Sequence, residues 1–103
     1  MNKNKYIDPN YTPDNQTLSE LESLNKDKQD LSNFHLEGAQ LENIYLVEAK
    51  IKASNLSKVN LKSASLFGSD LTGSNLFKAN LENANLNNSN LENCNLLGGN
   101  LLN

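Results

Sequence analysis

Few side chains in this sequence have the chemistry of a catalytic or metal-binding site. The chain has one histidine, His35, and one cysteine, Cys94. A structural metal site needs about four Cys or His ligands, and general acid–base catalysis needs a base positioned by partner groups. No serine stands in a pattern with His and Asp, and Gly98-Gly99 does not have the spacing of a phosphate-binding loop. The sequence therefore predicts a non-enzymatic protein with no metal site and no cofactor.

Charge and composition exclude further classes of protein. The 103 residues include 9 Lys, no Arg and 12 acidic residues, giving a net charge of −3. Because phosphate contacts need clustered cations, direct nucleic-acid binding is not expected. A single cysteine excludes an intrachain disulfide framework. The sequence shows neither the apolar run of a signal peptide nor an apolar segment of about 18 residues, so we expect a cytoplasmic protein without membrane contact.

Leucine recurs at every fifth residue over most of the chain. Asn and Leu together fill 39 of the 103 positions. A period of five fits neither an amphipathic helix, nor a coiled coil, nor a flat strand, and it is typical of a repeat with a five-residue unit. The fifteen successive repeat positions hold fourteen Leu and one Ile: Leu31, Leu36, Leu41, Leu46, Ile51, Leu56, Leu61, Leu66, Leu71, Leu76, Leu81, Leu86, Leu91, Leu96 and Leu101.

Neighbouring positions follow the same period. Two residues before the central Leu the side chain is usually small, and one residue before it Asn or Asp predominates, as in Ser74-Asn75-Leu76. The two positions after the Leu vary freely, so two side chains per unit are expected to point inward and three outward. Cys94 takes an inward place and is expected to be an inert buried thiol. The Asn side chains are expected to bond to neighbouring turns and to each other along the stack.

Runs such as Ala79-Asn80-Leu81-Glu82-Asn83 resemble the pentapeptide-repeat family, whose unit is Ala-(Asp/Asn)-Leu-x-x. The resemblance covers residues 29–103. It implies an all-β fold, a right-handed quadrilateral β-helix with four units per coil. Fifteen units then make about four coils, stacked at the ~4.8 Å spacing of β-strands.

The residues before the repeat predict two further segments. Residues 1–16 are polar, contain Pro9 and Pro13, and read as a flexible N-terminal arm. Residues 17–28 are expected to form a short helical cap, because Thr17 and Glu20 have the spacing of a capping box and Leu18, Leu21 and Leu24 form one stripe. We expect this helix to cover the open end of the first coil, where the oversized inward residues Phe34 and Ile44 fill a wider space.

Stacking at intervals of twenty residues predicts columns of outward side chains. Val47 and Phe67 share one column, and Phe77 and Leu97 share a column on the opposite face. Exposed apolar side chains on so small a surface suggest partner binding. The alternative is that isolated exposed apolar residues are ordinary, or that the rings lie along the coils and cover them.

Charged side chains also form columns. Glu42, Lys62 and Glu82 alternate in sign, as do Asp30, Lys50 and Asp70, which predicts pairing between coils. Lys58 and Lys78 stack like on like. That pair indicates either an anionic partner or two solvated side chains.

The repeat is still in phase at Leu101 and Leu102, so the last coil is expected to present an open end. We expect this end to form a homodimer, against the alternatives of a longer natural chain or an uncapped monomer. The leading functional hypothesis is a structural or scaffold module that binds an unidentified protein partner through an outer face or a coil end. The alternative, which the family resemblance implies, is a DNA-mimicking protein that binds a topoisomerase and protects or inhibits gyrase.

Overall fold

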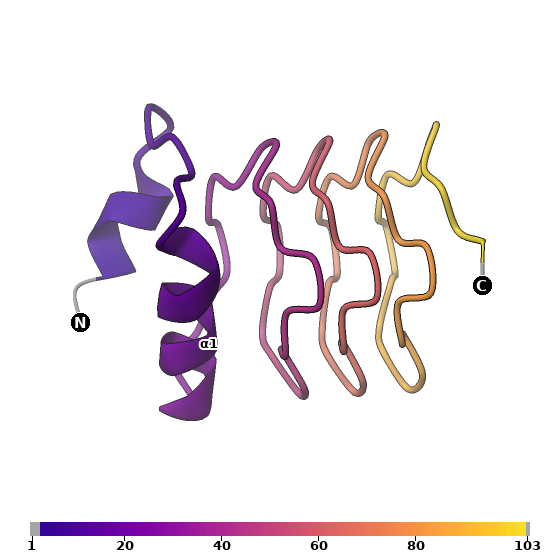
Figure 1. The fold of residues 1–103 in the computed structure, drawn as a ribbon, viewed down its shortest axis with the longest axis horizontal. Helices are drawn as coiled ribbons and strands as arrows, with labels where there is room; N and C mark the ends of the chain where they lie inside the picture. Colours follow the sequence, from indigo (N-terminus) through magenta and orange to yellow (C-terminus); the bar gives the residue numbers. More distant parts are fainter. Residues whose placement is uncertain (1–2, 103) are drawn as a thin grey trace.

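The computed structural model describes residues 3–102 of the chain (Figure 1). A 3-10 helix, η1 (Lys3–Ile7), and an α-helix, α1 (Thr17–Lys26), precede the repeat region. From residue 31 onward the backbone winds into coils stacked along the long axis of a molecule of 34 × 25 × 24 Å. The helix α1 lies within the predicted range 17–28.

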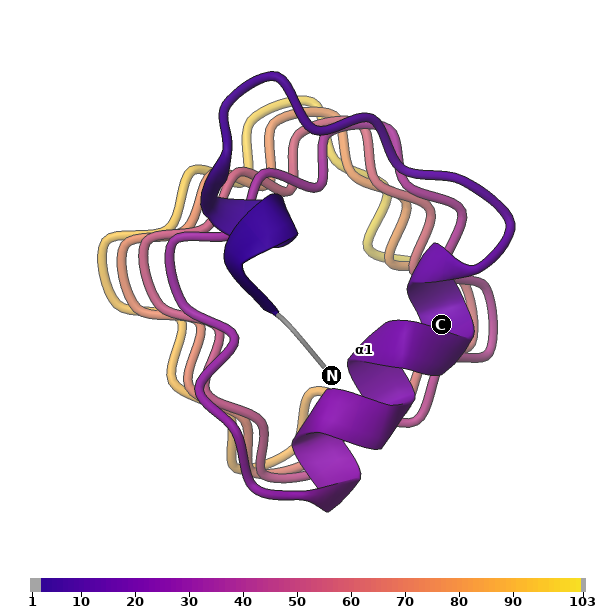
Figure 2. The same ribbon diagram turned by 90° about the vertical axis from the view of Figure 1, so that its left-hand side faces the viewer.

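Parallel β-bridges define the register of the coils. Each bridge joins a residue to the one twenty positions later, from His35–Asn55 to Asn80–Asn100. Four five-residue units therefore make one coil, and the coils superimpose as a four-sided ring when viewed along the axis (Figure 2). Each unit contributes only one bridge residue, because a turn follows every central Leu. Within residues 3–102 the sides of the coil are thus single bridges and turns, and the extended strands that the term all-β implies are not formed.

A left-handed residue sits in every turn, two positions after the central Leu. From Asn33 to Gly98 these fourteen residues have φ between 53° and 71°. Gly has no Cβ atom and adopts this conformation freely, and among the other residues Asn tolerates it best. Nine of the fourteen positions are Asn or Gly. The expectation that this position varies freely was therefore wrong. The remaining five are Glu48, Ala53, Lys58, Ser63 and Lys78.

Backbone hydrogen bonds join each unit to the next coil. The N–H of Leu36 donates to the carbonyl of Asn55 at 2.8 Å, and the N–H of Gly38 donates to the carbonyl of Ser57 at 2.9 Å. In the reverse direction, the N–H of Asn60 donates to the carbonyl of Ala39 at 2.9 Å. The pattern repeats around each coil, so the backbone polar groups inside the stack are paired as buried groups require.

The central Leu and the small residues line the inside of the coils, as the sequence predicts. From Leu31 to Leu81 the central side chains are at most 3% exposed. The space left between them is about 10 Å³, about the minimum that one water needs. Burial of these aliphatic side chains is the main apolar contribution to stability.

One inner column is polar. Ser54 Oγ donates to the carbonyl of Leu31 at 3.2 Å, and Ser74 Oγ donates to the carbonyl of Ile51 at 2.6 Å. In return, the backbone N–H of Ser54 donates to Ser74 Oγ at 3.0 Å. Cys94 Sγ continues the column by donating to the carbonyl of Leu71 at 2.9 Å. Each hydroxyl therefore ties one coil to the coil before it.

Helix α1 lies over one side of the mouth of the first coil (Figure 2). Its Leu21 and Leu24 are buried in the same core cluster as the leucines of the coils. The predicted capping box is not formed. Gln16 is the N-cap residue and makes no side-chain cap bond. Glu20 instead pairs with Lys5 at 2.8 Å and accepts a hydrogen bond from the Tyr6 hydroxyl. The carboxylate is thus used by η1 and not by the helix start.

Residues 3–16 are not the flexible arm that the sequence predicts. Tyr6 is fully buried, and its ring stacks on Phe34 with centroids 4.9 Å apart. Tyr11 packs edge-on against Tyr6 at 4.9 Å. Phe34 and Ile44 are 1% and 0% exposed, which confirms that these oversized residues are buried in the first coil. The aromatic stack orders the arm over the mouth of the coil.

Candidate protein-interaction surfaces

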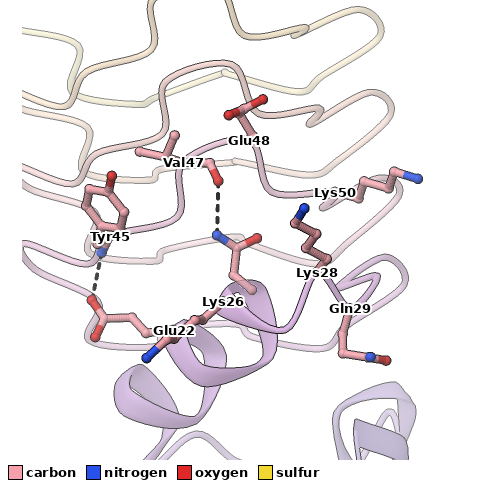
Figure 3. Close-up of a pocket in the computed structure, with 9 residues that line it drawn as sticks. Glu22, Lys26, Lys28, Gln29, Tyr45, Val47, Glu48 and Lys50 are labelled. Atoms are coloured by element: carbon pink, nitrogen blue, oxygen red, sulfur yellow. Dashed lines mark hydrogen bonds between the residues drawn. The ribbon is translucent and has the colours of Figure 1, made fainter.

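The N-terminal edge of the coil stack is covered by the segments before it. The N–H of His35 donates to the carbonyl of Tyr6 at 2.7 Å. On another side, the N–H of Tyr45 donates to Glu22 Oε2 at 2.8 Å, and Asn25 Nδ2 donates to the carbonyl of Val47 at 3.0 Å (Figure 3). These groups occupy the places that a preceding coil would take, so they limit further pairing at this edge.

The opposite edge is open within the described residues. Leu86, Leu91 and Leu96 are only half-buried, unlike the central leucines before them. Leu101 and Leu102 are 51% and 69% exposed. In residues 3–102 the backbone N–H groups of these half-buried leucines have no carbonyl partner, although their equivalents in earlier coils do. This edge combines apolar side chains with unpaired backbone groups.

The four apolar residues predicted to bind a partner lie on two opposite sides of the coil. Val47 and Phe67 are stacked on one side, and Phe77 and Leu97 on the other, since each pair is twenty residues apart. Phe67 and Leu97 are 39% and 70% exposed, while Val47 and Phe77 are half-buried. The structure therefore does not join the four into one patch, and their role in partner binding remains a prediction.

The charged columns pair only in part. Lys62 Nζ lies 3.5 Å from Glu82 Oε1, which confirms one of the expected pairs. Among residues 3–102 the Asp30–Lys50–Asp70 column forms no ion pair within 4.0 Å. Hydrogen bonds from Thr72 hold the pKa of Asp70 below its ordinary value, and Lys52 and Lys50 add to this.

The Asn and Asp side chains before the central leucines have a structural role, as was expected, but they bond mainly within their own turns, and no hydrogen bond joins two of these Asn side chains among residues 3–102. Asn55 Oδ1 accepts a hydrogen bond from the N–H of Ser57 at 3.1 Å. Most of these side chains close the same short loop by accepting a hydrogen bond from the N–H two residues later. Between coils, Asn60 Nδ2 donates to Gln40 Oε1 at 3.2 Å. Most of these side chains are therefore engaged in their own turns. The other acceptors in such loops are Asp30, Asn60, Asp70, Asn75, Asn80, Asn85, Asn90, Asn95 and Asn100.

A groove of about 770 Å³ lies beside the contact between α1 and the first coil (Figure 3). It was not predicted, because its walls come from distant parts of the sequence and carry no shared motif. The lining mixes both signs of charge, so its chemistry does not select one class of ligand. The residues are Glu22, Asn25, Lys26, Lys28, Gln29, Tyr45, Val47, Glu48 and Lys50.

The described residues hold few groups suited to catalysis. Within residues 3–102, no three His, Cys, Asp or Glu side chains gather in a way that could hold a metal ion. Cys94 is half-buried rather than buried as expected, and desolvation raises the pKa of its thiol, which favours the protonated form. Neither helix in this part of the chain has the length and apolar character needed to cross a bilayer.

Comparison with known proteins places the repeat in context. A family model described as pentapeptide repeats matches in eight copies, over residues 30–62, 45–83 and 74–103. Among solved structures, a pentapeptide repeat protein from the thylakoid lumen of Arabidopsis thaliana is 29% identical over 76% of this chain and 57% of its own, with a TM-score of 0.45.

Two cyanobacterial structures are also similar. One, from Cyanothece 51142, is 38% identical over 70% of this chain and 56% of its own, with a TM-score of 0.35. The other, from Nostoc PCC 7120, is 27% identical over 85% of this chain and 74% of its own, with a TM-score of 0.47. The chain thus spans just over half the length of the Arabidopsis and Cyanothece proteins. The comparison with curated proteins finds no match.

Proposed function

Because the chain belongs to the pentapeptide repeat family, we propose that it is a non-enzymatic structural module that binds other proteins. Membership of this family implies that the coils form a right-handed β-helix. The observation that carries the proposal is the difference between its two edges. Within residues 3–102, one edge is covered by η1 and α1, and the other leaves leucines half-buried and backbone groups unpaired. Such an edge is a template for pairing with another chain.

The partner at this edge is a second copy of the same chain. A head-to-tail assembly would need the covered N-terminal edge, where Glu22 and Asn25 already bond to the first coil. Two open edges can meet through a two-fold axis, which gives a closed dimer rather than a filament. Leu101 and Leu102, which are 51% and 69% exposed, would lie at or beside the interface.

Light scattering and analytical ultracentrifugation at micromolar concentration test this proposal. We expect a dimer for the 103-residue chain and a shift toward monomer for Leu102→Glu, since a two-fold axis brings the two new charges close together. The matched control is Ile7→Glu, which also charges an exposed aliphatic side chain but lies at the covered end. A monomeric chain at high micromolar concentration, or equal dissociation by both variants, would overturn the proposal.

The charge distribution does not favour the alternative of a DNA-mimicking topoisomerase partner. In residues 29–103, seven acidic residues stand among five Lys, and the acids fall on all four sides of the coil. Mimicry of duplex DNA needs a continuous acidic surface in place of the phosphates. A gyrase supercoiling assay would separate the two functions. The cytoplasmic location expected from the sequence stays a prediction.

A further inference from the structure

We propose that one side of the coil, formed by residues 56–60, 76–80 and 96–100, binds an acidic and apolar peptide segment of a partner protein. We call it the Lys58–Lys78 face. It extends the proposed interaction function to a second surface. It does not depend on pairing at the open edge, because the side chains that carry it, those of Lys58, Phe77, Lys78 and Leu97, lie on the outside of the coils.

The face carries an apolar strip across two coils. Leu97 is 70% exposed, the largest exposure of any large hydrophobic residue that the structure describes. Phe77 lies one coil earlier in the same column and is half-buried. Ser57, one coil before Phe77, is only 7% exposed. A partner side chain packed on Leu97 and the edge of Phe77 would remove this strip from water.

Two ammonium groups border the strip. Lys58 and Lys78 are stacked one coil apart, and among the described residues neither has a carboxylate within ion-pair distance. Lys78 Nζ lies 5.3 Å from the centre of the Phe77 ring. Glu37, in the first coil, is the single acidic residue on this side of the coil among residues 31–102. The face is therefore locally cationic on a chain of net charge −3, and it complements an acidic segment.

Lys78 also occupies a backbone position that disfavours it. Its φ is 57°, and all the remaining left-handed turn positions from residue 68 onward are Gly or Asn. Stacking two like charges in neighbouring coils adds a second unfavourable term. The stem of Lys78 lies close against Gly98, where an added Cβ would be 3.1 Å from Lys78 Cγ. Residues that break such local rules are expected at functional sites.

The shape of this side selects an extended peptide over a small molecule. The coils present a side of turns and bridges, and the groove beside α1 has no lining residue on this face. Neighbouring coils are ~4.8 Å apart, so two carboxylates of one segment can reach both ammonium groups. An apolar residue that follows them along the stack, beyond Lys78, would then meet Phe77 and Leu97.

A titration followed by ¹H–¹⁵N NMR tests the proposal with the full chain. The probe is the peptide acetyl-Glu-Glu-Leu-Glu-Glu-amide, and its Gln counterpart is the control peptide. We expect the acidic peptide to shift the amide signals of Phe77, Lys78, Leu97 and Gly98, and to bind more weakly as NaCl rises from about 0.05 M to about 0.5 M. Equal binding of the Gln peptide, or shifts confined to other sides, would overturn the proposal.

Matched variants separate this face from general electrostatic attraction. We expect Lys58→Gln/Lys78→Gln to weaken binding about tenfold, the loss of two exposed charge pairs. The control Lys50→Gln/Lys52→Gln removes the same charge from other sides and should leave affinity unchanged. An equal loss in the control overturns the assignment, as does recruitment to phosphatidylserine vesicles without peptide binding. Ultracentrifugation of the same samples reports the coil-end dimer separately, so failure of one proposal is distinguishable from failure of the other.

Discussion

The carboxylate of Glu22 accepts a hydrogen bond from the backbone N–H of Tyr45 at 2.8 Å. One coil later, the equivalent N–H of Ser65 donates to a backbone carbonyl, that of Ile44, also at 2.8 Å. A side chain of α1 therefore takes the place of a missing coil. Asn25 supplies a donor where Glu22 supplies an acceptor, since its side-chain amide donates to the carbonyl of Val47.

Replacing Glu22 should weaken the contact between α1 and the first coil. We expect Glu22→Ala to lower the free energy of unfolding by about 0.5–1.5 kcal/mol, the net worth of one hydrogen bond. Glu22→Gln keeps an acceptor oxygen and should cost less. Urea denaturation measures both, with Glu42→Ala, on an exposed outer position, as control. Equal effects of Glu22→Ala and Glu42→Ala would contradict the capping role.

The middle of the leucine column should be the most sensitive to truncation. Leu66 is 0% exposed, so we expect Leu66→Ala to cost about 2–5 kcal/mol and to abolish cooperative folding. Leu96 is half-buried at the open edge, and Leu96→Ala should cost less. Thermal melts followed by circular dichroism compare the two. A melt of Leu66→Ala that matches the unmodified chain would show that the column is not the core.

The inner polar column predicts opposite effects at two neighbouring coils. Ser74→Ala leaves the carbonyl of Ile51 and the N–H of Ser54 without their partner, at about 1–3 kcal/mol for each buried group. Cys94→Ser keeps a donor to the carbonyl of Leu71, so we expect unchanged or greater stability. Urea denaturation of both variants checks this. A neutral Ser74→Ala would mean that the two groups find other partners.

Acid should weaken the N-terminal cap. Hydrogen bonds from Lys5 and Tyr6 hold the pKa of Glu20 below its ordinary value of 4.5. The folded state thus favours the ionised carboxylate, and this stabilisation is present at neutral pH and is lost as pH falls below 4.5 through the lowered folded pKa. Unfolding midpoints from pH 7 to about pH 3 should show a shallower dependence in Glu20→Gln than in the unmodified chain. Parallel curves would exclude Glu20 as the group responsible.

The Lys58–Lys78 face predicts a conflict between stability and binding. Lys78 has φ 57°, and Asn tolerates this conformation better, so we expect Lys78→Asn to stabilise the fold by about 0.5–1 kcal/mol while weakening peptide binding. Gly98→Ala is the contrasting change, because φ is 71° and the new Cβ would meet Lys78 Cγ at 3.1 Å; it should destabilise. Urea midpoints measure both. A destabilised Lys78→Asn would mean that Lys78 is kept for folding.

The sequence by itself determined the repeat and therefore the coil. A Leu at every fifth position, with a small residue two places before it, is satisfied when both side chains point into one tube. Spacing arithmetic also placed Val47 with Phe67 and Phe77 with Leu97, since columns follow from the repeat alone. The turn geometry was missed, because nine positions with Asn or Gly are mixed with five of other types.

Only the tertiary structure decided how the ends are treated. Tyr6 is buried because Phe34, 28 positions later in the sequence, presents a ring on which it stacks, and no local pattern in a polar segment announces such a contact. The same holds for Glu20, whose carboxylate serves Lys5 and Tyr6 and not the start of its helix. Periodic local contacts repeat in the sequence and can be read from it, whereas single long-range contacts are made once and depend on where the folded coil brings the chain.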